Sequence, residues 1–269
     1  MKKLFLGSVA LVALGLGAPA AFAAERPVPA YAPPPPPPPA YTWSGCYIGA
    51  SAGTSSGRSQ HFTTAGSTVS PSPVPITAGA PITDSFNLSG FIGGGQLGCN
   101  WQWGAWVFGI EGDGSATNKS GQGFETVLVP LVPGSASFIS ETQERWLVTA
   151  RGRLGLTGLG WWGPNTLLYV TGGGAWAKID TSEWDSLNSI GFRSHQESNT
   201  RSGWTVGGGL EYALGYGWSA KGEFLYVKFD NFTTFTNAPF ATGGTGTVAP
   251  REVKLEDYIW RAGLNYKFW

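Results

Sequence analysis

Apolar and polar side chains alternate along most of the chain from Trp43 onward. In the stretch WQWGAWVFGIEGD, Trp106, Phe108 and Ile110 fall on one face, and Glu111 falls on the other. A period of two residues is that of a β-strand, whose successive side chains point to opposite faces. This pattern, together with aromatic enrichment, predicts eight strands. They span Ser44–Ala52, Leu88–Gln102, Ala105–Ser115, Gln143–Thr157, Asn165–Asp180, Arg201–Leu214, Trp218–Phe229 and Lys254–Phe268.

The connections between these strands alternate strictly in length. Three are tight turns, at Gln102–Gly104, Gly158–Pro164 and Gly215–Gly217. Four are long and rich in Ser, Thr, Gly, Asn and Pro, at Gly53–Asn87, Ala116–Thr142, Thr181–Thr200 and Asp230–Val253. Bacterial outer-membrane barrels have an even number of strands, short periplasmic turns and long external loops. The sequence therefore predicts an all-β fold, an eight-stranded antiparallel up-and-down transmembrane β-barrel.

One face of the predicted strands is apolar, and the other carries charges of both signs in mid-strand, with Val107 and Leu225 as apolar exceptions. An Arg or Lys turned toward lipid at mid-depth costs roughly 2–4 kcal/mol, so the charged face should line the interior. An eight-stranded interior is only wide enough for side chains, and buried charges must pair. We therefore predict a lumen charge network of Glu111, Arg151, Arg153, Glu211, Lys221, Glu223 and Arg261. The pattern leaves open whether this network plugs the lumen or lines a narrow path for water or ions.

The N-terminal segment has the features of a secretory signal peptide. MKK precedes an apolar run that ends in Ala21-Phe22-Ala23, an A-x-A cleavage site. We predict residues 1–23 as the signal peptide, residues 24–42 as a proline-rich periplasmic linker, and residues 43–269 as the barrel. No later stretch reaches the roughly 20 apolar residues of a spanning helix. A soluble β-sandwich is the alternative, but export, loop alternation and the aromatic residues near the strand ends favour the barrel.

Composition narrows the function classes. Charged residues make up 13% of the chain, which also has 41 Gly and 13 Trp, so it is too hydrophobic to be disordered. The formal net charge is zero, which gives no basic field for nucleic acid. We predict no metal site and no cofactor. Cys46 and Cys99 fall near the periplasmic ends of adjacent predicted strands, and we predict a cross-strand disulfide between them.

Three runs of glycine, Gly93–Gly95, Gly172–Gly174 and Gly207–Gly209, lie inside predicted strands. A phosphate-binding loop would join a strand to a helix and continue with Lys-Ser or Lys-Thr. We expect these glycines instead to permit tight curvature or to let large side chains pack over bare backbone.

Five segments resemble the small outer-membrane β-barrel proteins of alphaproteobacteria, the porin-like or outer-membrane immunogenic protein family. They are GCYIGASAG, GGGQLGCNWQWGAWVFGIEGD, WLVTARGRLG, GWSAKGEFLYVKFD and YIWRAGLNYKF. The resemblance covers Trp43 to the C-terminus and implies an eight-stranded barrel in the cell outer membrane, a protein abundant at the surface, and antigenic loops. It also implies a C-terminal assembly signal of alternating aromatic residues, which Tyr266 and Phe268 fit. Trp269 departs from the family pattern by one residue, and Cys46 and Cys99 stand where aromatic residues are expected.

Three functions are compatible with this fold. The first is a structural protein that presents long external loops for membrane integrity, adhesion or host contact. The second is a narrow passive channel, and the third is a barrel enzyme. His61, Ser194 and His195 lie in predicted external loops, but adjacent residues on a strand point apart, so we predict no catalytic dyad and no enzyme. The expected partners are outer-membrane lipid and lipopolysaccharide, the barrel-assembly machinery, and peptidoglycan or host surface molecules.

Overall fold

The computed structural model describes residues 41–64, 68–69, 74–75, 79–81, 83–124, 137–160, 163–187, 190–234 and 250–268. The predicted signal peptide, residues 24–40 of the predicted linker, and Trp269 lie outside these residues. The chain divides into two units, Met1–Pro39 and Ala40–Trp269, and the second contains all the described residues. Among them, no helix is both long enough and apolar enough to cross a bilayer.

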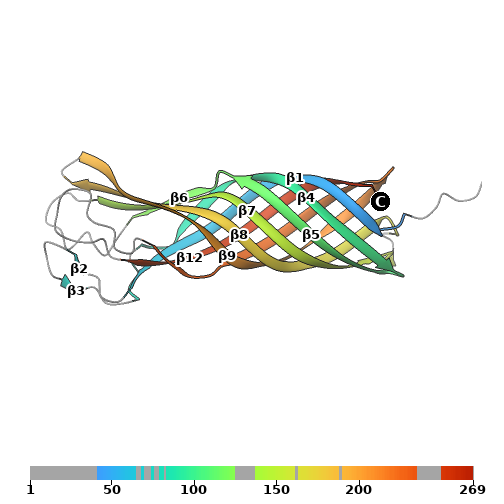
Figure 1. The fold of residues 1–269 in the computed structure, drawn as a ribbon, viewed down its shortest axis with the longest axis horizontal. Helices are drawn as coiled ribbons and strands as arrows, with labels where there is room; N and C mark the ends of the chain where they lie inside the picture. The colour runs from blue at the N-terminus through green and yellow to red at the C-terminus, as the bar shows by residue number, and fades with distance from the viewer. Residues whose placement is uncertain are drawn as a thin grey trace, which may run out of the picture. The chain divides into compact units, whose positions relative to one another are not determined.

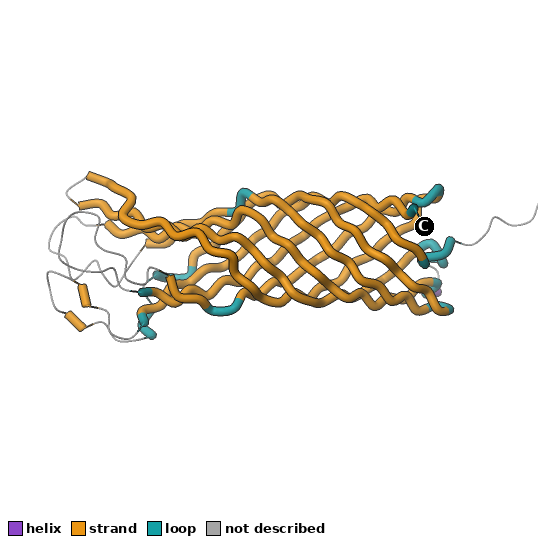
Figure 2. Tube along the Cα trace, in the orientation of Figure 1, coloured by secondary structure: helices purple, strands orange, loops and turns teal. Residues whose placement is uncertain are grey.

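Long antiparallel strands close into a ring of eight, as predicted (Figures 1 and 2). They are β1 (Gly45–Thr63), β4 (Phe86–Trp103), β5 (Trp106–Thr117), β7 (Ser137–Thr157), β8 (Thr166–Leu187), β9 (Ile190–Gly215), β10 (Trp218–Phe229) and β12 (Arg251–Lys267). Each pairs with the next in this order, and β12 pairs back with β1. Short strands accompany them: β2 (Thr68–Val69) pairs with β3 (Val74–Pro75), β6 (Ser120–Phe124) mainly with β7, and β11 (Phe232–Thr234) with β12.

The strands continue further toward the long-loop end than the sequence pattern predicted. The predicted loop Thr181–Thr200 is for the most part a paired hairpin, because β8 reaches Leu187 and β9 begins at Ile190. That part of the prediction was wrong. The period-two contrast depends on one face meeting lipid, and at the start of this extension the buried side chains Thr181, Ser182 and Glu183 are all polar, so the pattern fades.

An apolar band with aromatic residues near both edges forms the outward face of the barrel. Trp106, Phe108 and Ile110 are 49%, 47% and 59% exposed, whereas Glu111 is 2% exposed. Exposed aromatic residues gather near the short-turn ends at Trp101, Trp103, Trp106, Trp218 and Tyr266, and toward the long-loop ends at Trp176, Trp204 and Tyr258. Tyr258 on β12 and Phe268, which directly follows the end of this strand, are ten residues apart. At ~3.3 Å per residue and a tilt of ~40°, this spacing spans ~25 Å, the height of an outer-membrane apolar band.

The glycine runs alternate between the two faces of the barrel wall. A Cβ built on Gly94 would lie 2.0 Å from the Gly114 carbonyl oxygen, so this inward face has no room for a side chain. A Cβ on Gly209 would lie 2.5 Å from the Gly222 carbonyl oxygen and 2.7 Å from the Tyr169 hydroxyl. The inward glycines thus leave space for the large side chains of the interior.

Two glycine substitutions on neighbouring strands test this packing. Gly209→Ala should lower the free energy of unfolding by about 1–3 kcal/mol, because the new methyl group overlaps backbone and the Tyr169 hydroxyl. Gly222→Ala should be neutral or slightly stabilising, because nothing lies within 4 Å of its Cβ position and alanine orders the strand better. Urea titration of detergent-solubilised protein, read by the mobility of unboiled samples on a gel, measures both. Equal effects of the two changes would contradict this account.

Candidate functional site in the barrel interior

The structure brings all seven predicted lumen charges together inside the barrel. Their side chains come from five strands and are 2–5% exposed: Glu111 on β5, Arg151 and Arg153 on β7, Glu211 on β9, Lys221 and Glu223 on β10, and Arg261 on β12. They share the inward face because each alternates along its strand with residues of the lipid-facing band. Together they form the charged layer of the lumen.

Glu111 lies at the centre of the charged layer. The Lys221 ammonium lies 3.0 Å from each of its carboxylate oxygens, and Arg151 Nη2 lies 2.5 Å from Oε1. The Tyr47 hydroxyl donates a hydrogen bond of 2.7 Å to Oε2. Each carboxylate oxygen therefore has charged or polar donors from other strands, as a buried carboxylate requires.

Asp113 also belongs to the charged layer, although it was not among the seven predicted lumen charges. Arg261 Nη1 donates to Asp113 Oδ1 at 2.7 Å, and Arg151 Nη2 donates to Oδ2 at 3.1 Å. Asp113 lies two residues after Glu111 and so shares its face, which was the available cue in the sequence. With it, the layer balances Glu111, Asp113, Glu211 and Glu223 against Arg151, Arg153, Lys221 and Arg261.

Neutral side chains complete the layer on its periplasmic side. The Arg153 guanidinium lies 3.9 Å from the centre of the Tyr169 ring and donates to Glu211 at 2.7 Å. Asn265 Nδ2 donates to Glu211 Oε1 at 2.7 Å, and Gln96 donates to Asn265. Tyr47 and these neutral residues could be placed only by their inward parity, which does not reveal partners on other strands.

Trp43 closes the lumen below the charged layer. It is 3% exposed, and its indole N–H is within 3.1 Å of both the Thr157 hydroxyl and the Pro164 carbonyl oxygen. It belongs to an apolar cluster with Val107, Leu167, Tyr169 and Ala213. Trp43 therefore fills the interior of the barrel at its periplasmic mouth, on the periplasmic side of the charged layer.

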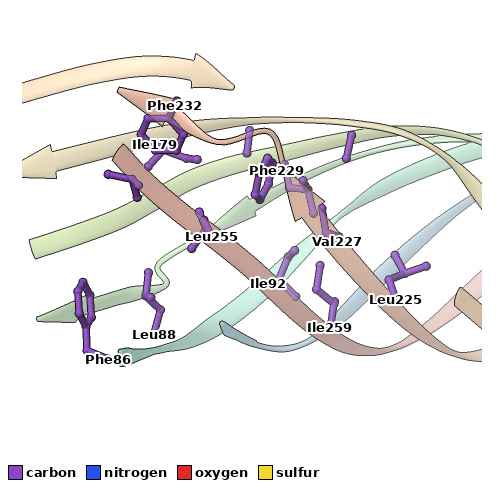
Figure 3. Close-up of a cluster of buried hydrophobic side chains, with 14 residues drawn as sticks. Phe86, Leu88, Ile92, Ile179, Leu225, Val227, Phe229, Phe232, Leu255 and Ile259 are labelled. Carbon is purple, nitrogen blue, oxygen red and sulfur yellow. The ribbon is translucent and has the colours of Figure 1, made fainter. Parts of the chain in front are cut away.

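On the other side of the charged layer, the interior is lined by a large buried apolar cluster together with polar side chains such as Ser55 and Asp257 (Figure 3). Along β10, Lys221 and Glu223 are followed on the same face by Leu225, Val227 and Phe229, all 0–2% exposed. The cluster comprises Phe86, Leu88, Ile92, Leu147, Ala175, Ala177, Ile179, Leu225, Val227, Phe229, Phe232, Val253, Leu255 and Ile259. Val107 and Leu225, the two exceptions in the sequence pattern, thus belong to the two apolar layers that flank the charges.

One ion cluster is enclosed at the level of this apolar layer. Lys119 Nζ lies 2.7 Å from Glu144 and 2.5 Å from Asp257, and all three side chains are fully buried. Lys119 fell in a predicted loop, at the break between β5 and β6, so no strand pattern placed it inside the barrel.

Of the two candidate histidines, the structure describes the side chain of His61 alone. His61 is fully buried at the loop end of β1, beyond the apolar band, and burial lowers its pKa to about 3. Its Nε2 lies 3.4 Å from the Thr142 hydroxyl. Ser194 and His195 lie in β9, but their side chains lie outside the description. Within the described residues, no group of three His, Cys, Asp or Glu side chains is arranged to hold a metal ion.

The barrel thus has an apolar exterior and a charged layer inside, and comparison with known proteins places the chain in a family of membrane barrels. The family described as "Outer membrane protein beta-barrel domain" matches residues 8–268. The chain belongs to this outer-membrane β-barrel family. It is 30% identical over 280 residues to the 31 kDa outer-membrane immunogenic proteins of Brucella melitensis and Brucella suis, with 100% of each chain covered. It is also similar to the crystal structure of Neisserial surface protein A, with 14% identity, 84% and 98% coverage and a TM-score of 0.35.

Like its family, this barrel resides in the outer membrane. Its periplasmic end carries the remaining predicted features. Cys46 and Cys99 lie opposite each other on β1 and β4, with Cα atoms 4.0 Å apart, and form a disulfide. They share the outward face with Ile48 and Leu97, so the bond lies on the lipid side of the wall. Tyr266 and Phe268 of the predicted assembly signal also face outward, 41% and 59% exposed.

Removing one partner of the charged layer should be far more damaging than removing one surface charge. Arg151→Met removes one of the buried cations that Glu111, Asp113 and Glu223 share, leaves the charged layer with one uncompensated negative charge, and should lower the free energy of unfolding by about 3–5 kcal/mol. Lys228→Met breaks an ion pair with Glu256 whose side chains are 46% and 36% exposed, and should cost at most about 1 kcal/mol. The urea midpoint in detergent micelles measures both, and similar shifts would rule out the charged layer as a stabilising unit.

The disulfide should stabilise the barrel by about 2–4 kcal/mol, because it closes a long loop in the unfolded chain. Its cysteines are 53 residues apart in sequence. Replacing both with serine should lower the urea midpoint, and a reductant should lower the wild-type midpoint to the same value without affecting the variant. A urea midpoint of the wild-type protein that stays the same after full reduction of the disulfide would contradict the prediction.

Proposed function

We propose that this protein is a non-conducting outer-membrane scaffold that presents extracellular segments for contact with surface molecules of a host or of neighbouring cells. The observation that carries the proposal is the layered interior. Trp43, the charged layer and the apolar cluster follow one another along the barrel, so a solute would have to displace all three. A narrow passive channel has no comparable support, since its path would cross the apolar cluster around Leu225, Val227 and Ile259.

The extracellular strand extensions support the second part of the proposal. The hairpin of β8 and β9 continues well past the aromatic residues Trp176 and Trp204. A rigid β-extension carries the connecting segments away from the lipid surface, which suits recognition by loops. The Brucella relatives are named immunogenic, which is consistent with surface-exposed segments in this family.

An enzymatic role fits less well. The described histidine at the loop end, His61, is enclosed next to Phe86 and Thr142 and is neutral at physiological pH. A general base must reach its substrate, and an enclosed ring cannot. We therefore include no catalytic step in the proposal.

Conductance and adhesion together test the proposed function. In planar bilayers, the wild-type protein should give no single-channel steps, and neither should a Glu111→Ala/Arg151→Ala variant, because the apolar cluster still closes the lumen. In cell-binding assays, replacing residues 125–136 and 235–249 with Gly-Ser linkers should abolish adhesion while the barrel still folds. A control with the same residues in scrambled order separates specific recognition from loop bulk. Stable channels formed by the wild-type protein would overturn the proposal. Adhesion that survives replacement of both segments with Gly-Ser linkers would do the same.

A further inference from the structure

One covalent bond crosses the lipid-facing wall of the barrel, between Cys46 on β1 and Cys99 on β4. The outward side chains around it are apolar. Ile48 and Leu97 lie two residues from the cysteines toward the membrane centre, and Ile110 on β5 lies opposite Cys99. These three side chains are 57%, 67% and 59% exposed, so in the outer membrane the two sulfur atoms lie against hydrocarbon.

Exposed tryptophans separate this disulfide from the periplasm. On β4, Trp101 and Trp103 follow Cys99 on the outward face, and Trp106 begins β5 after the turn. Tryptophan collects where the apolar band of a barrel meets water. At ~3.3 Å per residue and a tilt of ~40°, Cys99 lies ~10 Å from the level of Trp103. A folded enzyme in the periplasm therefore has no contact with the sulfur atoms of the inserted barrel.

Disulfide formation by an enzyme requires that contact. One thiolate attacks the disulfide of a dithiol oxidase to form a mixed disulfide, and the second thiolate of the pair then displaces the enzyme's cysteine. The two thiols give up two electrons and two protons, and the enzyme's disulfide takes them up to become a dithiol. A thiolate is stable in water but not in hydrocarbon, where its charge has no partner. Contact and ionisation are both possible only while β1 and β4 are outside the membrane.

The same two strands lack the charges that help to align the rest of the ring. The charged layer has members on β5, β7, β9, β10 and β12, so β1 with β4 is the one neighbouring pair of ring strands without a member. Both strands are rich in glycine and other small residues, and register is weakly specified in such strands. Their connection is also long, so their pairing costs more loop-closure entropy than a tight turn does. The disulfide thus lies at the pair of strands that charges do not align.

We propose that a soluble dithiol oxidase of the periplasm joins Cys46 to Cys99 before the chain enters the membrane, and that the bond holds β1 and β4 in their native register during assembly. The barrel-assembly machinery then receives a chain whose first two ring strands are already aligned. The other edge of β1 stays free for β12, whose pairing closes the ring. The disulfide is therefore a constraint on assembly as well as a stabilising bond of the finished barrel.

Oxidation of the reduced wild-type protein tests the order of events. The reduced full chain is either kept unfolded by omitting lipid or folded into lipid nanodiscs, which leave both ends of the barrel open to solution. A purified, oxidised soluble dithiol oxidase should convert the unfolded chain to the disulfide form and leave the folded barrel reduced, as read by mass after alkylation of free thiols. In cells depleted of the barrel-assembly machinery, the chain should likewise become oxidised. Equal oxidation of the folded and unfolded forms, or a chain that stays reduced in those cells, would overturn the proposed order.

A second cysteine pair on the same two strands controls for access of the enzyme. Arg58 and Asn87 lie opposite each other on β1 and β4, face outward, and lie past the level of Tyr258 at the extracellular edge. In a Cys46→Ser/Cys99→Ser background, Arg58→Cys/Asn87→Cys should be oxidised in the folded barrel as well as in the unfolded chain. Unboiled gel mobility verifies that the variant is folded. If this pair also stayed reduced in the nanodisc, lipid would not explain the protection of Cys46 and Cys99, and the proposal would fail.

A misaligned disulfide tests the role in register. Leu97→Cys/Cys99→Ser moves one sulfur atom by two residues on the same face, so its bond to Cys46 holds β1 and β4 out of register. When oxidised before lipid is added, the wild-type chain should fold into vesicles faster than its reduced form. The oxidised variant should instead fold more slowly than its own reduced form, with the mobility of unboiled samples over time as the measure. A wild-type rate that does not change with oxidation, or a variant that folds equally fast in both forms, would overturn the role in register.

Discussion

The fold depends on the inability of lipid to accept or donate backbone hydrogen bonds. Every strand in the hydrocarbon must therefore pair on both sides, and the pairing of β12 with β1 removes the last free edge. A ring of eight strands has a narrow interior, which side chains fill completely. The inward glycines, such as Gly94 and Gly209, follow from this lack of space, because guanidinium and phenol groups need bare backbone to pack against.

The charged layer also helps to fix the register in which neighbouring strands pair. The lipid-facing side chains cannot fix it. A slip of two residues between neighbouring strands keeps apolar side chains outward and meets no penalty from lipid. The same slip separates Glu111 from Arg151 and Asp113 from Arg261, whose hydrogen bonds join three strands. A buried ion network is a poor source of net stability compared with an apolar core, but its directional contacts penalise misaligned pairings.

The sequence predicted structure where contact with lipid imposes a two-residue alternation of apolar and polar side chains, and it failed where that contact is absent. Eight strands, their faces and seven inward charges could be read from the alternation, because a lipid-facing residue must be apolar. The hairpin beyond Asp180 was missed, since water on its outer face removes the contrast. Lys119 could not be placed either, because its position depends on the break between β5 and β6 and on partners from β7 and β12, far away in sequence.

The two neighbours of β1 are held to it in different ways. The disulfide between Cys46 and Cys99 ties β1 to β4 within the first half of the chain. Its other neighbour, β12, is the last strand, so this pairing forms only when the C-terminal segment arrives, and it is held by backbone hydrogen bonds and side chains alone. In this pairing Arg58 on β1 lies directly opposite Glu256 on β12, so opposite charges add to the backbone hydrogen bonds where the ring of strands closes.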